Sequence, residues 1–267
     1  MNCLESLDVP TGVTSVVGSG GKTTLLRAIA EELAARDESV VLATTTHFLA
    51  FAGMPLVTSD DEGGLADALG RRGVACVGVP VAPRGGRDGA RSAAVGDQAA
   101  AGAAGGQATA DAVRALPKLG PSPIPVARLA QLAGHVLVEA DGSRHLPLKA
   151  HAEHEPVVPP ESALRILVVG ASGLGSPVRK AAHRPELFCE RAGCAADDAA
   201  TPELVARVIS AEVAAGLLSP DRVVVNQVED AAARARAGRL ARELARLGVG
   251  TPVLAGSIRA HDLERIG

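Results

Sequence analysis

Short apolar runs and segments of helical period alternate along most of this chain. Residues 13–17 and 39–43 are apolar runs of strand length. Between them, apolar residues recur every three or four positions, the spacing of a helix that is buried along one side. These residues are Leu25, Leu26, Ile29, Ala30 and Leu33. A strand, a helix and a second strand in this order predict a βαβ unit and therefore a parallel sheet.

The alternation continues towards the end of the chain. Further strands are predicted at 74–79, 136–138, 165–169, 221–225 and 252–254. Further helices are predicted around Leu65 and Leu69, around Leu129 and Leu132, from Thr201 to Val213, and over 229–247. The pattern predicts an α/β fold of three α/β/α layers, with a mainly parallel twisted sheet, in a single domain over residues 1–267.

One segment departs from this pattern. Residues 84–112 consist almost entirely of Gly, Ala, Arg, Ser and Gln, with Val95 as the one large apolar residue. Such a segment cannot bury enough apolar surface to offset its ordering entropy. We expect a flexible insertion within the domain, because strand-like sequence resumes after it.

The first strand runs directly into a glycine-rich turn, VTSVVGSGGKTT over residues 13–24. Glycines let the backbone approach a ligand, and the free N–H groups of a helix N-terminus favour an anion. A lysine here reaches terminal phosphates, and the threonine after it can bind Mg²⁺. The predicted phosphate-binding residues are Gly18, Ser19, Gly20, Gly21, Lys22, Thr23 and Thr24.

This turn is a shortened form of the phosphate-loop pattern, G-x-x-G-K-T-T. Val16 stands where the full pattern has its first glycine, and Thr23 stands where a dinucleotide-binding G-x-G-x-x-G has its third. The order of strand, glycines, Lys-Thr and amphipathic helix nevertheless predicts a fold like that of the P-loop NTPases.

Polar residues follow two other predicted strands. Thr44, Thr45 and Thr46 follow the second strand, and of these Thr45 is our candidate for a nucleotide contact. Glu139 and Asp141 follow the strand at 136–138, and alternation places both on one face of an extended chain. Ligands of open α/β sheets lie beyond the carboxyl ends of the strands, so we expect these residues beside the phosphate loop.

Two further segments carry candidate binding residues. Residues 143–155 are polar, and His151, His154 and Glu155 could ligate a metal or face a substrate or a phosphate. Asn226 begins the run N-Q-V-E-D after the strand at 221–225, a place where many nucleotide-binding α/β proteins read the base. Gln227 stands where a base-reading lysine would be expected, which leaves ATP and GTP both open.

Composition and charge narrow the class of partner. The chain has 267 residues, 47% of them hydrophobic, with no Trp or Tyr, and its formal net charge is −3. This charge favours neither nucleic acid nor an anionic membrane. We see no apolar run of transmembrane length and no signal peptide, and the four scattered cysteines lack the spacing of a zinc site. We expect a cytoplasmic protein with reduced thiols.

Taken together, the motifs resemble those of the YqeC family. They are GSGGKTT, TTTH at 44–47, VEADGSRHLPLKAHAEHEPVVP at 138–159, HRPEL at 183–187 and the final NQVED. The resemblance covers nearly the whole chain outside 84–112. It implies a nucleotide-binding accessory protein for the maturation of selenium-dependent molybdenum hydroxylases, with such an enzyme or a cofactor-handling protein as its client.

The sequence therefore predicts a slow NTP hydrolase that binds ATP or GTP with Mg²⁺. Lys22 would neutralise the phosphates, and Thr23 and Asp141 would hold the metal. Glu139 or a threonine of 44–46 would place water, and Gly142 would offer its N–H to the terminal phosphate. Two alternatives stay open: ligase or kinase chemistry with a phosphate loop like that of the Mur ligases, and a nucleotide-sensing scaffold without catalysis.

Overall fold

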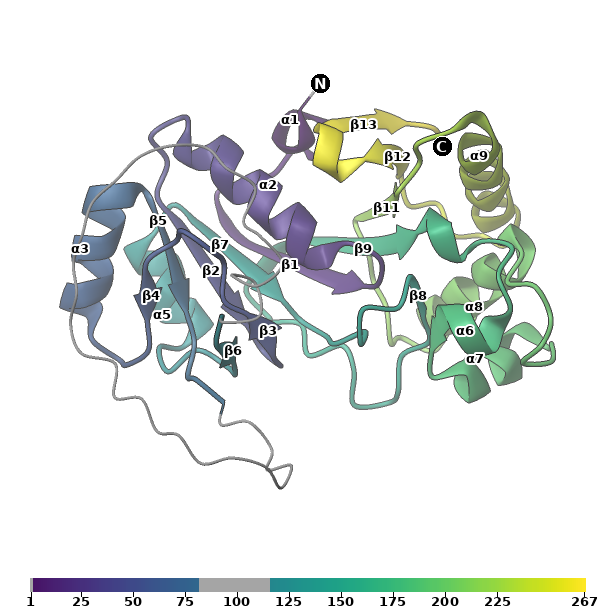
Figure 1. The fold of residues 1–267 in the computed structure, drawn as a ribbon, viewed down its shortest axis with the longest axis horizontal. Helices are drawn as coiled ribbons and strands as arrows, with labels where there is room; N and C mark the ends of the chain where they lie inside the picture. The colour runs from purple at the N-terminus through teal and green to yellow at the C-terminus, as the bar shows by residue number, and fades with distance from the viewer. Residues whose placement is uncertain (1, 82–115) are drawn as a thin grey trace.

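Eight parallel strands and one antiparallel edge strand form the central sheet of residues 2–81 and 116–267, the residues that the computed structural model describes (Figure 1). The predicted insertion at 84–112 lies outside these residues. From one edge to the other, the strands are β13 (Asp262–Arg265), β12 (Val253–Ser257), β11 (Arg222–Asn226), β9 (Ser162–Gly170), β1 (Gly12–Gly18), β7 (His135–Glu139), β2 (Val40–Thr44), β5 (Val74–Val77) and β4 (Leu56–Val57).

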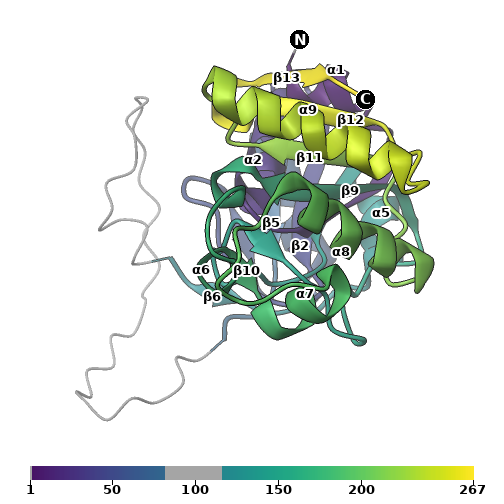
Figure 2. The same ribbon diagram turned by 90° about the vertical axis from the view of Figure 1, so that its right-hand side faces the viewer.

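Helices cover both faces of this sheet. On one face, Val16 of β1 packs with Leu25 and Ile29 of α2 (Lys22–Ala34). On the other, Val17 and its neighbours pack with α8 (Pro202–Ala214) and α9 (Ala231–Arg246), which lie side by side in Figure 2. Helices α3 (Glu62–Arg72) and α5 (Val126–Leu132) cover the rest of this second face. The predicted three-layer α/β fold with a mainly parallel sheet is confirmed.

Several short elements complete the fold. They are α1 (Cys3–Leu7), α6 (Val178–Ala181), α7 (Pro185–Ala192), the parallel pair β8 (Leu148–Lys149) and β10 (Ala182–His183), and the antiparallel pair β3 (Phe48–Leu49) and β6 (Lys118–Leu119). No helix in the described part of the chain has both the length and the apolar content to cross a bilayer.

The sequence located the main strands and helices to within a few residues, but it did not predict α1, α7 or β13. The pattern also placed the last strand at 252–254. In the structure β12 extends to Ser257, and β13 pairs with it in the antiparallel sense to form the edge. Helix α1 has only five residues, and β13 buries a single side chain, Leu263, so neither carries a periodic signal.

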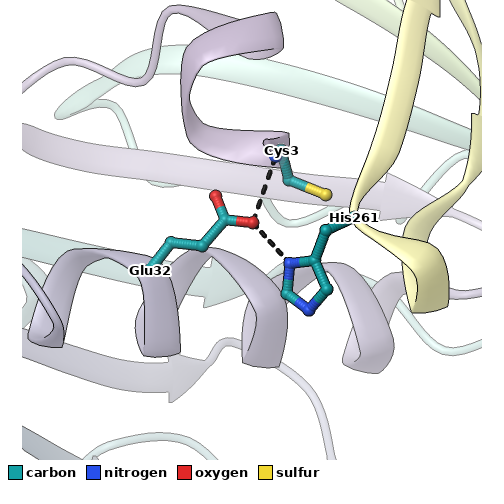
Figure 3. Close-up of side chains that lie close together, drawn as sticks. All are labelled: Cys3, Glu32 and His261. Atoms are coloured by element: carbon teal, nitrogen blue, oxygen red, sulfur yellow. Dashed lines mark hydrogen bonds and ion pairs between the residues drawn. The ribbon is translucent and has the colours of Figure 1, made fainter. Parts of the chain in front are cut away.

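The two ends of the chain are joined through Glu32 on α2. Its carboxylate accepts hydrogen bonds from the backbone N–H groups of Cys3 and Leu4, at 3.1 and 2.7 Å, and it contacts the ring of His261 (Figure 3). The buried Cys3 thiol lies in the same group, where burial and the Glu32 charge raise its pKa to about 12. Glu32 therefore caps the first helix and ties it to the segment before β13.

We predict that Glu32→Ala lowers the free energy of unfolding by about 2 kcal/mol, because two N–H groups of α1 lose a charged acceptor. Urea unfolding followed by far-UV circular dichroism measures this change. The matched control is Glu31→Ala on the same helix. The exposed ion pair of Glu31 with Arg27 contributes at most about 0.5 kcal/mol to the free energy of unfolding. Equal losses in the two variants would show that the capping contact contributes nothing.

Candidate functional site

The carboxyl ends of five neighbouring strands meet at an open cleft of about 1060 Å³. The strands are β11, β9, β1, β7 and β2, which places the residues after each of them side by side. Of the residues predicted from the sequence, Gly20, Gly21, Lys22, Thr23, Thr24, Glu139 and Gly142 line this cleft. The structure therefore brings together the phosphate loop and one acid of the β7 segment at the cleft surface.

The loop between β1 and α2 can follow its path only because three of its residues are glycines with positive φ. These are Gly18, Gly20 and Gly21, at 92°, 84° and 134°. A Cβ on Gly20 would lie 2.4 Å from the Cα of Gly170 after β9, and one on Gly21 would lie 2.2 Å from the Asn226 amide nitrogen after β11. The loop is thus pressed against the two neighbouring strand ends.

Helix α2 begins inside this loop with its first turn open to the cleft. Gly21 is the N-cap residue, and among the described residues no side chain caps the turn. The first N–H groups of a helix have no partner within the helix and together carry a partial positive charge. Because Lys22, Thr23 and Thr24 of this turn line the cleft, the site favours an anion there.

Lys22 folds back onto the loop that precedes it. Its ammonium nitrogen lies 2.7 Å from the Gly18 carbonyl oxygen, 3.1 Å from Oδ1 of Asp141 and 3.8 Å from Oε1 of Glu139. The side chain is almost wholly buried. A buried ammonium group needs such partners, because removing it from water without them is costly.

Asp141 is the most heavily bonded side chain of the site. Its Oδ2 accepts from the Gly18 N–H at 2.9 Å and from Lys149 at 2.9 Å, and it lies 2.8 Å from Nε2 of His151. Burial raises the pKa of this carboxyl, but Lys22, the His151 hydrogen bond and Lys149 outweigh burial and hold the pKa well below its usual range. Asp141 is therefore a permanent carboxylate.

The pKa of Glu139 is shifted in the opposite direction to that of Asp141. Burial raises its pKa, and the opposing effects of Lys22 and the Thr23 hydroxyl do not reverse this shift. The Thr23 hydroxyl donates to Oε2 of Glu139 at 3.0 Å. Thr23 and Asp141, the two residues predicted to hold the metal, do not contact each other here: the Thr23 hydroxyl faces Glu139, while Lys149, His151 and the Gly18 N–H surround Asp141.

A buried chain of charges continues behind Asp141. The other ring nitrogen of His151, Nδ1, lies 2.6 Å from Glu212 on α8, and Glu212 also contacts Arg191 on α7. Burial lowers the pKa of His151, but its bonds to the two carboxylates outweigh burial and raise it. Glu212 was missed from the sequence, although an acid in register with Val205, Val208 and Ile209 on an apolar helix face was a usable signal.

Other predicted residues lie where they support the loop. The Asn226 amide donates to the Gly20 carbonyl at 2.8 Å and accepts from the Ile258 N–H at 3.0 Å, so it braces the phosphate loop. The Ser19 hydroxyl is buried and donates to the Leu148 carbonyl at 3.2 Å. Thr45 donates to the Val157 carbonyl, and it is Thr46 that lines the cleft.

The segment 143–155 does not form the metal site that its sequence allowed. His151 is buried between two carboxylates, whereas His154 is exposed. Glu155 lines the cleft and accepts from Lys149 at 2.7 Å and Arg184 at 2.6 Å. Burial raises the pKa of Glu155, but these two cations outweigh burial and lower the pKa to about 2. The segment is a wall of the cleft.

A comparison with protein families decides the relationship. The family described as YqeC protein matches residues 14–186, well over half of the chain. This chain belongs to the YqeC family. The match to YqeC includes the phosphate loop, the β7 acids and the cleft wall up to α7, so the resemblance inferred from the motifs is confirmed.

Two individual proteins are similar to this YqeC chain in sequence or in fold. The chain is 33% identical over 188 residues to the uncharacterized protein YqeC of Escherichia coli (strain K12). This alignment covers 69% of this chain and 62% of the relative. The chain thus spans less than two thirds of that relative's length. The structure of chloroplast FtsY from Physcomitrella patens has a TM-score of 0.43 and 15% identity, over 97% of this chain and 63% of that one.

Close packing of the loop yields a first test. We predict that Gly20→Ala lowers the free energy of unfolding by about 2–5 kcal/mol, because strain at positive φ adds to overpacking against Gly170. Gly53→Ala is the matched control, since Gly53 has φ of 79° but no atom within 4 Å of an added Cβ. It should lose about 1–2 kcal/mol. Urea unfolding that gave the two variants equal losses would contradict close packing at Gly20.

The contrast between the two acids yields a second test. We predict that Asp141→Asn costs about 3–5 kcal/mol of stability, because it leaves Lys22, Lys149 and His151 buried around a neutral group. Glu139→Gln should change stability by about 1 kcal/mol or less, because the amide oxygen can still accept from the Thr23 hydroxyl and the Lys22 ammonium lies 3.8 Å from the carboxylate. Urea unfolding followed by circular dichroism measures both, and a larger loss in Glu139→Gln would contradict the assignment.

Proposed function

We propose that this protein binds a nucleoside triphosphate with Mg²⁺ and hydrolyses it slowly. The observation that carries the proposal is the arrangement around Gly18: a glycine loop, an uncapped helix N-terminus, a buried lysine, and two carboxylates at the end of the adjacent strand β7. The phosphates would lie on Gly18 to Thr24, where backbone N–H groups and Lys22 offer positive charge.

The residues present fit a magnesium ion, with one change from the sequence-based assignment. The Thr23 hydroxyl and the Glu139 carboxylate are hard oxygen donors 3.0 Å apart, and both line the cleft. We assign the metal to these two. A bound Mg²⁺ would neutralise charge on the phosphate oxygens. Asp141 becomes a positioning residue, since its carboxylate holds Lys22 and the Gly18 N–H in place.

The roles of the other residues follow from their contacts. Lys22 would contact the terminal phosphates and thereby weaken its ion pair with Asp141. Lys149 and His151 would continue to compensate the negative charge of Asp141. Thr46 and Gly142 line the cleft at two neighbouring strand ends, where the Thr46 hydroxyl and the Gly142 N–H would orient water or phosphate. The proposal covers both ATP and GTP, because the Asn226 amide is committed to the loop.

Membership of the YqeC family supports the biological part of the proposal. We propose that the protein acts in the cytoplasm as an accessory in the maturation of selenium-dependent molybdenum hydroxylases. Nucleotide turnover would change the conformation of residues 44–48 and 142–155, parts of which line the cleft beside the phosphate loop. The client would be such an enzyme or a protein that handles its cofactor.

The experiment that tests nucleotide binding is calorimetric titration of Lys22→Met with ATP and with GTP, each with and without Mg²⁺. We expect affinity for the bound nucleotide to fall at least tenfold, because the loop loses its one side-chain cation. Lys180→Met on α6 is the matched control: it removes an exposed lysine that does not line the cleft, and it should leave affinity within twofold.

Lys22 also compensates buried acids, so a stability measurement accompanies the titration. If Lys22→Met melts below the assay temperature, Lys22→Gln replaces it, because its amide can still donate a hydrogen bond to the buried acids. Nucleotide affinity that survives unchanged in a folded variant would overturn the proposal. Phosphate release by the wild type, lost in the variant, would support hydrolysis.

A further inference from the structure

The cleft beyond the phosphate loop is larger than a set of phosphates requires. Its volume of about 1060 Å³ reaches the upper end of the range of small-molecule sites. The loop and Glu139 form one end. A wall beside the loop is built from residues 144–147 and 182–186, and the parallel pairing of β8 with β10 links the two segments. A ligand on this wall would share the cleft with the terminal phosphate.

The wall carries arginines next to acids. Glu155 is bonded to both Lys149 and Arg184, Lys149 is also bonded to Asp141, and Glu186 lines the wall as well. Arg144 lines the same wall and is exposed. His183 lines the same wall, where burial and the charges of Arg184, Lys149 and Arg144 lower its pKa to about 4.

Positive φ values occur at several residues that line the cleft, three of them on this wall. Within the described part of the chain, seven residues other than glycine have positive φ, and four of them line this cleft. They are Arg144, His145, Arg184 and Gln227, with φ between 50° and 66°. A non-glycine residue in this region costs about 1–2 kcal/mol, and such residues concentrate where a ligand is bound.

We propose that this wall is a second binding site, for the oxyanion of a small-molecule substrate that lies next to the nucleotide. Arg144 and Arg184 would bind the oxyanion, a phosphate monoester or a carboxylate, and neutral His183 would add a hydrogen bond. Arginine suits this task because its planar fork binds either group through two parallel N–H donors. This inference rests on the proposed function for its choice of neighbour, and it makes the protein one that handles two ligands at once.

The test uses inorganic phosphate as the probe, in equilibrium dialysis at low salt. Wild type should bind phosphate at the loop and at the wall, and Lys22→Met should keep only the wall. In the Lys22→Met background, Arg144→Gln should weaken phosphate binding at least fivefold. Lys180→Gln removes a nearby exposed cation outside the cleft, and it should leave binding within twofold.

Further arms separate the outcomes. Competition by succinate or by a phosphate monoester tells which oxyanion the wall prefers, and displacement by either supports the site. His183→Asn serves as a second variant and should also weaken binding. If wild type binds no nucleotide while the wall still binds phosphate, the proposed function fails and the second site stands. If Arg144→Gln, His183→Asn and Lys180→Gln bind phosphate alike, the second site is overturned.

Discussion

The structure around the cleft depends on one buried carboxylate, that of Asp141. A charge removed from water must find compensating partners, and Asp141 finds a backbone N–H, two lysines and a histidine. These partners come from the phosphate loop, from the start of α2 and from the segment after β7. A single residue therefore fixes the position of the loop relative to the wall. Through His151 and Glu212 it also reaches α8.

The two acids after β7 show how position alone separates chemical roles. Glu139 and Asp141 stand two residues apart at the end of one strand, yet burial raises the pKa of the first, while cations hold the pKa of the second down. Pairs of titratable groups whose pKa values are driven apart are a usual mark of divided roles. Here the permanent carboxylate holds the loop together. The adaptable one faces the Thr23 hydroxyl and the open cleft.

Much of this could be predicted from the sequence, because it depends on local pattern. The spacing of apolar residues predicted the strands and helices. The rule that parallel strands end at one edge of the sheet predicted that Lys22 lies close to Glu139 and Asp141. What the sequence could not give were the partners that depend on three-dimensional packing. Lys149 and His151 were visible as polar residues, but their bonds to Asp141 depend on how the chain turns after Gly142. The exact use of the Asn226 amide likewise depends on a contact with Gly20, 206 residues away.

The charges at the cleft form a continuous series from one wall to the other. Lys22 contacts Asp141, Asp141 contacts Lys149, Lys149 contacts Glu155, and Glu155 contacts Arg184. The signs of the charges alternate along this series. An anion that drew Lys22 away from Asp141 would therefore strengthen the attraction between Asp141 and Lys149. Arg184 would then provide more of the charge compensation for Glu155. The phosphate loop and the wall are thereby linked through side-chain contacts that are already in place.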